Sequence, residues 1–275
     1  QSEGTWLIYH LCGLDGITEL LRSCRGAAAR VQEAVVWAIY DLATKQRSCG
    51  KAGAAEWPQA ETLVLLLLEV MRGQPSKPAS VDLLWACCMA LRLIAEAQPC
   101  RGSLFIEHGG DKAVLTALGV GQAAGDAGES LLVAGMQLIA TLVDGNAFAA
   151  QRLRSLGALD SLVACGLSLP GKVTDQTMWT LGQIGGVLAV LQVMSQASGS
   201  RDAVGSGLAA LAKLTWMPVE DTLQQQLPQA AEALVGLARR VAQERPMEDL
   251  VFTLQALGGV LHILTPHIAP GSWSV

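Results

Sequence analysis

Apolar residues recur every three or four positions along most of the chain, the spacing that places them on one face of an α-helix. The segment 31–43 shows this pattern, with its polar residues on the opposite face. Few stretches alternate apolar and polar residues in the period of two that a half-buried strand requires. The sequence therefore predicts an all-α protein.

The long amphipathic segments repeat at a regular interval. Aligning the chain on itself superposes four of them, at 31–43, 81–91, 129–139 and 175–185. Their matched residues are Trp37, Trp85, Val133 and Trp179, which are 48, 48 and 46 positions apart. A shorter amphipathic segment comes before each long one. Such a period is typical of stacked helical units, none of which can bury its apolar face alone.

Parts of this pattern resemble the armadillo repeat family. Residues 16–23 (GITELLRS) and 31–38 (VQEAVVWA) look like the second and third helices of its three-helix unit. The run 179–184 (WTLGQI) is similar to the third helix of nuclear-import adaptors of the importin-α type. The resemblance covers about residues 13–264. It implies a right-handed α-solenoid superhelix of armadillo-like helical repeats.

Under this interpretation, residues 1–275 form a single armadillo-like repeat domain. The expected repeats are approximately 13–57, 58–108, 109–156, 157–185, 186–215 and 228–264. Gly185 and Gly186 run directly into an apolar segment at 187–194, which leaves no room for a short first helix there. Because the sequence begins at Gln1 rather than Met, we expect it to be a fragment of a longer chain.

The periodic tryptophans are candidates for a binding surface. Stacked long helices line a concave groove, and the residue four positions after each Trp position shares its face. The expected groove residues are Trp37, Asp41, Trp85, Met89, Gln137, Trp179 and Gln183. Trp would supply rigid contact area, while Gln and Asp would contact a peptide backbone or a cation. We therefore expect a non-enzymatic scaffold that binds an extended peptide or helix of a partner protein.

Two alternatives to this scaffold stay open. The chain is only 16% charged, which favours an architectural subunit whose apolar surfaces are buried permanently in a larger complex. The tryptophans would then pack between repeats. A nuclear-import cargo adaptor has weaker support, because the resemblance implies Asn beside each Trp and this chain has no Asn at those positions.

Charge and hydropathy exclude other classes of partner. The net charge is −5 and the charges are evenly mixed, so the chain lacks the basic stripe of a nucleic-acid-binding surface. Two nearly uncharged stretches, 178–194 and 250–268, are each interrupted by a Gly-Gly pair. Neither has a flanking Lys or Arg cluster, so both are predicted as interior helices rather than membrane spans.

The residues with catalytic or metal-binding chemistry form no recognisable site. His262 and His267 flank Pro266, so they cannot share a helix face as a zinc-binding pair does. The seven cysteines are odd in number and include no CxxC pair. We expect most to be buried thiols in a reducing compartment, cytoplasm or nucleus, although the organelle stays open. The sequence predicts no enzyme activity, no cofactor, no metal and no small-molecule substrate.

Overall fold

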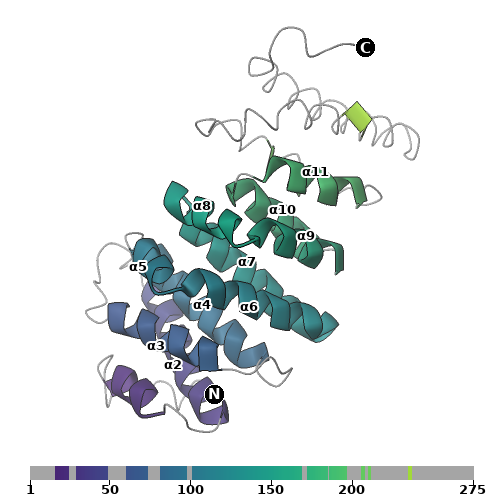
Figure 1. Cartoon of the computed structure of the whole chain (residues 1–275). Coiled ribbons are helices and arrows are strands. Elements are labelled where there is room, and N and C mark those ends of the chain that lie inside the picture. The colour runs from purple at the N-terminus through teal and green to yellow at the C-terminus, as the bar shows by residue number, and fades with distance from the viewer. Residues whose placement is uncertain are drawn as a thin grey trace. The chain divides into compact units, whose positions relative to one another are not determined.

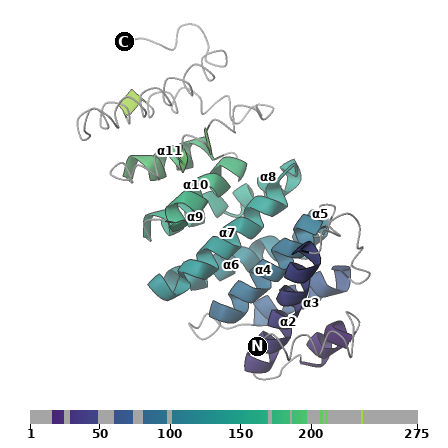
Figure 2. The same ribbon diagram turned by 180° about the vertical axis from the view of Figure 1, so that it is seen from behind.

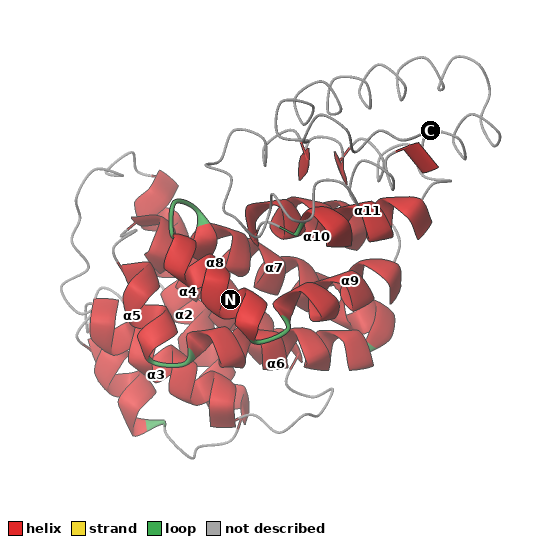
Figure 3. Ribbon diagram, turned by 45° about the horizontal axis from the view of Figure 1, so that its top comes forward, coloured by secondary structure: helices red, strands yellow, loops and turns green. Residues whose placement is uncertain are grey.

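The computed structural model describes residues 16–24, 29–48, 60–73, 81–97, 101–168, 172–184 and 186–196, with the pairs 206–207, 210–211 and 235–236. Every regular element in these ranges is a helix, and they contain no strand (Figure 3). The prediction of an all-α protein is confirmed for this part of the chain. The chain divides into two compact units, Gln1–Arg152 and Leu153–Val275. One continuous repeat domain over 1–275 stays a prediction.

Long helices lie side by side in the first unit. After a helical stretch at 16–23, the elements are α2 (Ala29–Ser48), α3 (Ala60–Gly73), α4 (Val81–Ala97), α5 (Arg101–Glu107), α6 (Gly110–Ala123), the 3₁₀ helix η2 (Gly125–Gly128) and α7 (Glu129–Val143). α4 packs against both α2 and α7, and the two opposite views agree on this order (Figure 1, Figure 2). These three helices carry Trp37, Trp85 and Val133, the matched positions of the repeat.

Aliphatic packing around α4 holds the first unit together. Eleven of its 17 residues are buried, and α3 and α6 also pack against it. Burial of each Leu or Ile side chain contributes about 1.5–3 kcal/mol relative to exposure. The partly exposed residues Trp85, Met89 and Arg92 follow one another at four and three positions. They therefore form one stripe along α4, whose other residues between Leu83 and Ala95 are buried.

Two glycines end short helices at equivalent points of the repeat. Gly109 follows α5, and Gly157 comes 48 positions later, after α8 (Ala147–Ser155). Their φ angles are 69° and 76°, a left-handed conformation that residues with a side chain rarely adopt. The Gly109 N–H donates to the Ile106 carbonyl, and the Gly157 N–H donates to the Arg154 carbonyl, both at 3.0 Å. The recurrence of this turn supports a unit made of a short, a middle and a long helix.

An ion pair between a buried carboxylate of α6 and a partly exposed arginine of α8 links these two helices. The Asp111 side chain is fully buried, and one of its oxygens accepts a hydrogen bond from Arg152 Nε at 2.8 Å. Its other oxygen accepts from the Lys112 backbone N–H, also at 2.8 Å. Removing these donors would leave a buried carboxylate uncompensated, which would strongly lower the free energy of unfolding. The ion pair therefore favours the position in which the Arg152 side chain lies against α6.

The second unit contains α9 (Ala158–Ser168), α10 (Lys172–Ile184) and α11 (Val187–Gln196), which pack against one another. Arg154, in the last turn of α8, donates a hydrogen bond of 3.0 Å to the Ile184 carbonyl at the end of α10. Only two residues separate α10 from α11, so the predicted absence of a short helix there is confirmed. The predicted helices at 202–214 and 228–264 lie outside the described residues, apart from the three helical pairs.

One stretch in the described ranges, Gly125–Val143, is long and apolar enough to cross a membrane by length and composition. About half of it (56%) is buried, and α7 packs against α4 and α6, so a core helix explains the same composition. The apolar segment 178–194 is divided between α10 and α11 rather than forming one continuous helix. The other predicted interior helix, 250–268, lies outside the described residues.

The contact between α6 and η2 requires glycine. A Cβ added to Gly128 would lie 1.9 Å from the Gly121 carbonyl oxygen, which is backbone and cannot rotate away. A Cβ on Gly121 would approach the Leu132 side chain at 3.0 Å. By contrast, nothing lies within 4 Å of a Cβ built on Gly119, in the middle of α6.

Gly128→Ala should therefore lower the free energy of unfolding by about 1–3 kcal/mol or more, because the backbone must shift to admit the methyl group. Gly119→Ala is the matched control and should be neutral or stabilising by up to about 1 kcal/mol, since alanine favours the helix. Urea unfolding followed by circular dichroism measures both. Equal effects of the two substitutions would contradict the close approach of α6 and η2.

Candidate binding surface

The periodic tryptophans of the first unit belong to a partly exposed row that crosses three neighbouring helices. Each of these helices contributes two half-buried side chains that are four positions apart, and most of their neighbours in sequence are buried. The members are Trp37 and Asp41 on α2, Trp85 and Met89 on α4, and Val133 and Gln137 on α7. We call this row the α2–α4–α7 face. It brings together five of the seven groove residues that the sequence predicts.

Three aromatic rings meet on α2 and α4. The ring centroids of Trp37 and Trp85 are 4.9 Å apart, and their planes are tilted by 35°. Tyr40 stands edge-on to both indoles, with centroid distances of 5.6 Å to Trp37 and 5.5 Å to Trp85. Aromatic pairs of this kind add about 0.5–1.5 kcal/mol each beyond the area they bury. Rings this close leave no room for a side chain between the indoles, so a partner would contact the outer surface of the cluster.

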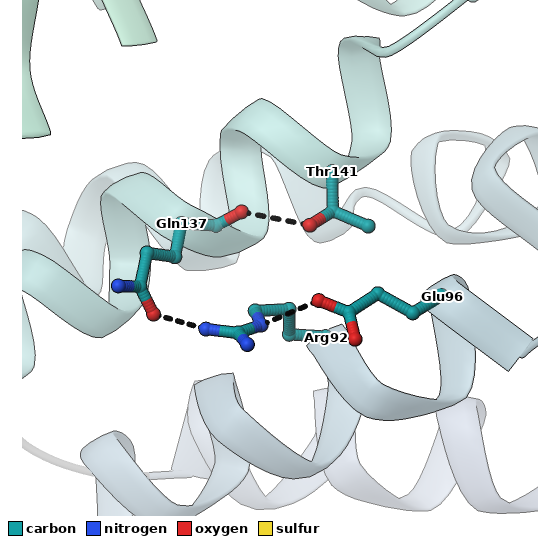
Figure 4. A network of polar contacts seen from close by, with 4 residues as sticks. All are labelled: Arg92, Glu96, Gln137 and Thr141. Atoms are coloured by element: carbon teal, nitrogen blue, oxygen red, sulfur yellow. Dashed lines mark hydrogen bonds and ion pairs between the residues drawn. The ribbon is translucent and has the colours of Figure 1, made fainter. Parts of the chain in front are cut away.

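A polar network follows on α4 and α7, as Figure 4 shows. Arg92 Nε lies 2.8 Å from Glu96 Oε1, and Arg92 Nη1 donates to Gln137 Oε1. The Thr141 hydroxyl donates to the backbone carbonyl of Gln137 at 3.0 Å. Glu96 therefore offsets the charge of Arg92, while Arg92 holds the oxygen of the Gln137 carboxamide.

Three residues beside this row were not predicted from the sequence, namely Tyr40, Arg92 and Glu96. Tyr40 is three positions after Trp37, and Arg92 is three positions after Met89. Neighbours on a helix face lie at three as well as four positions, so the same argument extended to i+3 would have found both. The Arg92–Glu96 spacing of four is likewise that of a helical ion pair.

Two carboxylates of α2 accompany the aromatic cluster. Asp41 is one turn beyond Trp37, and Glu33 is one turn before it, and both are partly exposed. Neither forms an ion pair with any side chain in the described ranges. A cationic group of a partner would be favoured at this end of the face.

The two remaining groove candidates lie on α10, in the second unit, and differ from each other. Trp179 is 41% exposed, whereas Gln183 is only 6% exposed. Gln183 is therefore much less accessible than Trp179, and its role in a groove stays a prediction. At the preceding position, a Cβ added to Gly182 would lie 2.9 Å from Ala210 Cβ. Ala210 thus lies close to Gly182 of α10, a contact that Trp spacing alone does not indicate.

Burial makes the described core thiols poor nucleophiles. Cys87, Cys88 and Cys165 are buried and form no disulfide. Burial raises the pKa of Cys88 to about 12 and that of Cys165 to about 11. Burial, and secondly the adjacent Cys88, raises the pKa of Cys87 well above its usual value. Since the thiolate is the reactive form, these residues stay largely unreactive near neutral pH.

No group of three or more His, Cys, Asp or Glu side chains in the described part of the chain is arranged to hold a metal ion. His108 is exposed. His10, His262 and His267 lie outside the described residues.

Raised thiol pKa values predict a loss of stability at alkaline pH. Unfolded thiols lose their protons near pH 9.0, whereas Cys88 keeps its proton in the folded state to about pH 12. The folded state binds more protons in this interval, so the free energy of unfolding falls as pH rises, by about 1.4 kcal/mol per pH unit for each such thiol. Cys88→Ala should flatten this slope between about pH 9 and pH 11. Cys24→Ala, which removes a partly exposed thiol, is the control. Urea unfolding across this pH range measures the slopes, and identical slopes in all three proteins would contradict the assignment.

Comparison with known proteins shows similarity of fold. No family model and no curated protein sequence matches the chain. Two crystal structures of engineered proteins from the Northeast Structural Genomics Consortium are similar to it. One is 13% identical with a TM-score of 0.61, and the match covers 93% of this chain and 98% of that one. The other is 17% identical with a TM-score of 0.53, covering 92% of this chain and 100% of that one. At these identities the likeness concerns the fold alone.

Proposed function

We propose that this chain is a non-enzymatic protein–protein interaction scaffold, built as a right-handed, armadillo-like α-solenoid. It binds an extended peptide or helix of a partner protein along a concave groove of which the α2–α4–α7 face is part. The scaffold uses no cofactor, metal or small-molecule substrate, and it neither binds nucleic acid nor spans a membrane. A reducing compartment, cytoplasm or nucleus, suits its free thiols.

The observation that carries this proposal is the aromatic cluster. Trp37, Tyr40 and Trp85 remain partly exposed on helices whose other apolar residues are largely buried. Trp and Tyr dominate binding energy at many interfaces, because they present a large rigid area. The row continues from this cluster across α4 to α7, which gives a bound segment further contacts.

A nuclear-import adaptor remains the weaker form of this proposal. The positions where the resemblance implies Asn hold Asp41, Met89 and Gln137 in the first unit. The contact between Trp37 and Trp85 also leaves no slot for a side chain between the two indoles.

An architectural subunit is the second candidate, and two exposed rings favour it. Phe148 on α8 is 56% exposed, and Trp179 on α10 is 41% exposed. Together with a charged fraction of 16%, these rings fit surfaces that a larger complex covers. Single exposed apolar residues are also normal on proteins that act alone, so this observation carries less weight than the aromatic cluster.

Trp85→Ala should weaken binding to a partner by more than about 1–2 kcal/mol, because it removes a large ring that contacts both Trp37 and Tyr40. The partner is obtained by affinity capture from the native source and identified by mass spectrometry, and its dissociation constant is then measured by calorimetry. Phe148→Ala is the control for loss of an exposed ring outside the face. Circular dichroism should show unchanged helicity. If Trp85→Ala unfolds the protein while the folded fraction binds normally, the indole is a structural residue and the groove assignment is wrong.

Size-exclusion chromatography separates the two candidates. The scaffold proposal expects the isolated chain to elute as a soluble monomer, because its apolar residues are covered by its own helices. Aggregation that a co-expressed partner relieves would instead support the architectural subunit, and Phe148→Ala should then reduce the aggregation.

A further inference from the structure

The end of α8 carries two arginines that each hold another helix, and both come just before an exposed serine. Arg152 pairs with Asp111 of α6, and Arg154 donates to the Ile184 carbonyl at the end of α10. Ser155 is the last residue of α8 and is exposed. We propose that Ser155 is a phosphorylation site for a serine kinase that recognises basic residues, and that its phosphate competes with Asp111 for Arg152. This inference is independent of the binding function proposed above.

The charge pattern before Ser155 is the sequence feature that such a kinase would recognise. Arginines lie three positions and one position before it, and among the serines and threonines in the described ranges Ser155 alone has arginine at both places. Kinases discriminate between substrates by the charges around the acceptor residue. Ser23 provides a contrast in the same molecule. It also ends a helix and is exposed, but it has Arg22 directly before it and Leu20 three positions before it.

A kinase can reach this pattern when the last turn of α8 opens. Kinases bind the acceptor residue in an extended segment, and the terminal turns of helices open more readily than their interiors. Within the last turn only Leu153 is fully buried, whereas Arg152 and Ser155 are exposed. Opening therefore removes one apolar side chain from the core and separates Arg152 from Asp111. The kinase would capture the state in which this ion pair is broken.

The chemical step is a phosphoryl transfer from a nucleoside triphosphate. The Ser155 hydroxyl oxygen forms a bond to the γ-phosphorus, and the bond between that phosphorus and the oxygen bridging it to the β-phosphorus breaks. The hydroxyl proton passes to a base of the kinase, and the nucleoside diphosphate leaves. Near neutral pH the product carries a charge of about −1.5 to −2 on three acceptor oxygens.

The position of Arg152 explains why the phosphate would compete with Asp111. Residues three positions apart are neighbours on a helix face, so the phosphate on Ser155 lies beside Arg152. The Arg152 side chain is 44% exposed and can turn toward the surface, whereas the buried Asp111 carboxylate cannot follow it. Of its two described donors, Asp111 would then keep the Lys112 backbone N–H. A buried carboxylate without its cation would loosen the packing of α8 on α6.

Kinase reactions on the intact chain test the site. The probe is the purified catalytic subunit of cyclic-AMP-dependent protein kinase with magnesium ATP, and mass spectrometry of peptides identifies each modified residue. Ser155 should be modified in the folded chain, and Ser23 should not. In a free peptide of residues 149–159, Arg152→Gln should slow modification about tenfold or more, the loss of one charge-assisted contact with the kinase.

Hydrogen exchange followed by mass spectrometry tests the consequence. Phosphoserine is incorporated at position 155 of the intact chain during translation. Amide exchange in α8 and in the first turn of α6 should become about tenfold faster or more, because Asp111 loses its cation. Arg152→Gln without phosphate should cause a similar rise, and phosphate added to this variant should have little further effect. Phosphoserine at position 23 is the matched control and should leave α6 and α8 unchanged.

Three other results would each overturn a defined part of the proposal. If the free peptide is modified but Ser155 in the folded chain is not, Ser155 is not a phosphorylation site of the folded protein. If phosphoserine at position 155 leaves exchange in α8 unchanged or slows it, the competition with Asp111 is wrong. If the phosphate speeds exchange equally in the wild type and in Arg152→Gln, it acts through its charge at the helix end and not through Arg152.

Discussion

The side-by-side packing of α4 between α2 and α7 is the contact on which the rest of the first unit depends. None of these helices could bury its apolar residues alone, and α4 buries eleven of 17 because helices contact it on several sides. Packed helix axes lie about 8–10 Å apart, close enough for large side chains on neighbouring helices to touch. The same packing that completes the core therefore also brings the indoles of Trp37 and Trp85 into contact.

Sequence periodicity predicted the long helices well because it is a local property. The expected segments 31–43, 81–91, 129–139 and 175–185 fall within α2, α4, α7 and α10 or differ from their ends by one residue. Each carries enough apolar residues at helical spacing to define its own buried side. The break between α10 and α11 was equally predictable, since a short helix cannot form where too few residues remain.

The candidate site was less predictable because it depends on contacts between helices. Arg92 and Gln137 are 45 positions apart, and their hydrogen bond requires α4 and α7 to pack at one register. Gln183 has the spacing of a surface residue, yet the approach of Ala210 to Gly182 accompanies its burial. Spacing on one helix indicates which residues share a side. It does not indicate what a later part of the chain places over that side.

Contact between the indoles changes what the repeated tryptophans can do. Two separated rings could each pack against one side of a side chain inserted between them. Trp37 and Trp85 instead pack against each other, and Tyr40 stands edge-on to both. The cluster can then add contact area and attract a cation at its outer surface, but it has little capacity to select the shape of an inserted side chain. If the face binds a partner as proposed, selectivity would come from directional groups elsewhere on it. The Gln137 carboxamide is one such group, because Arg92 donates to its carbonyl oxygen and so limits how it can turn.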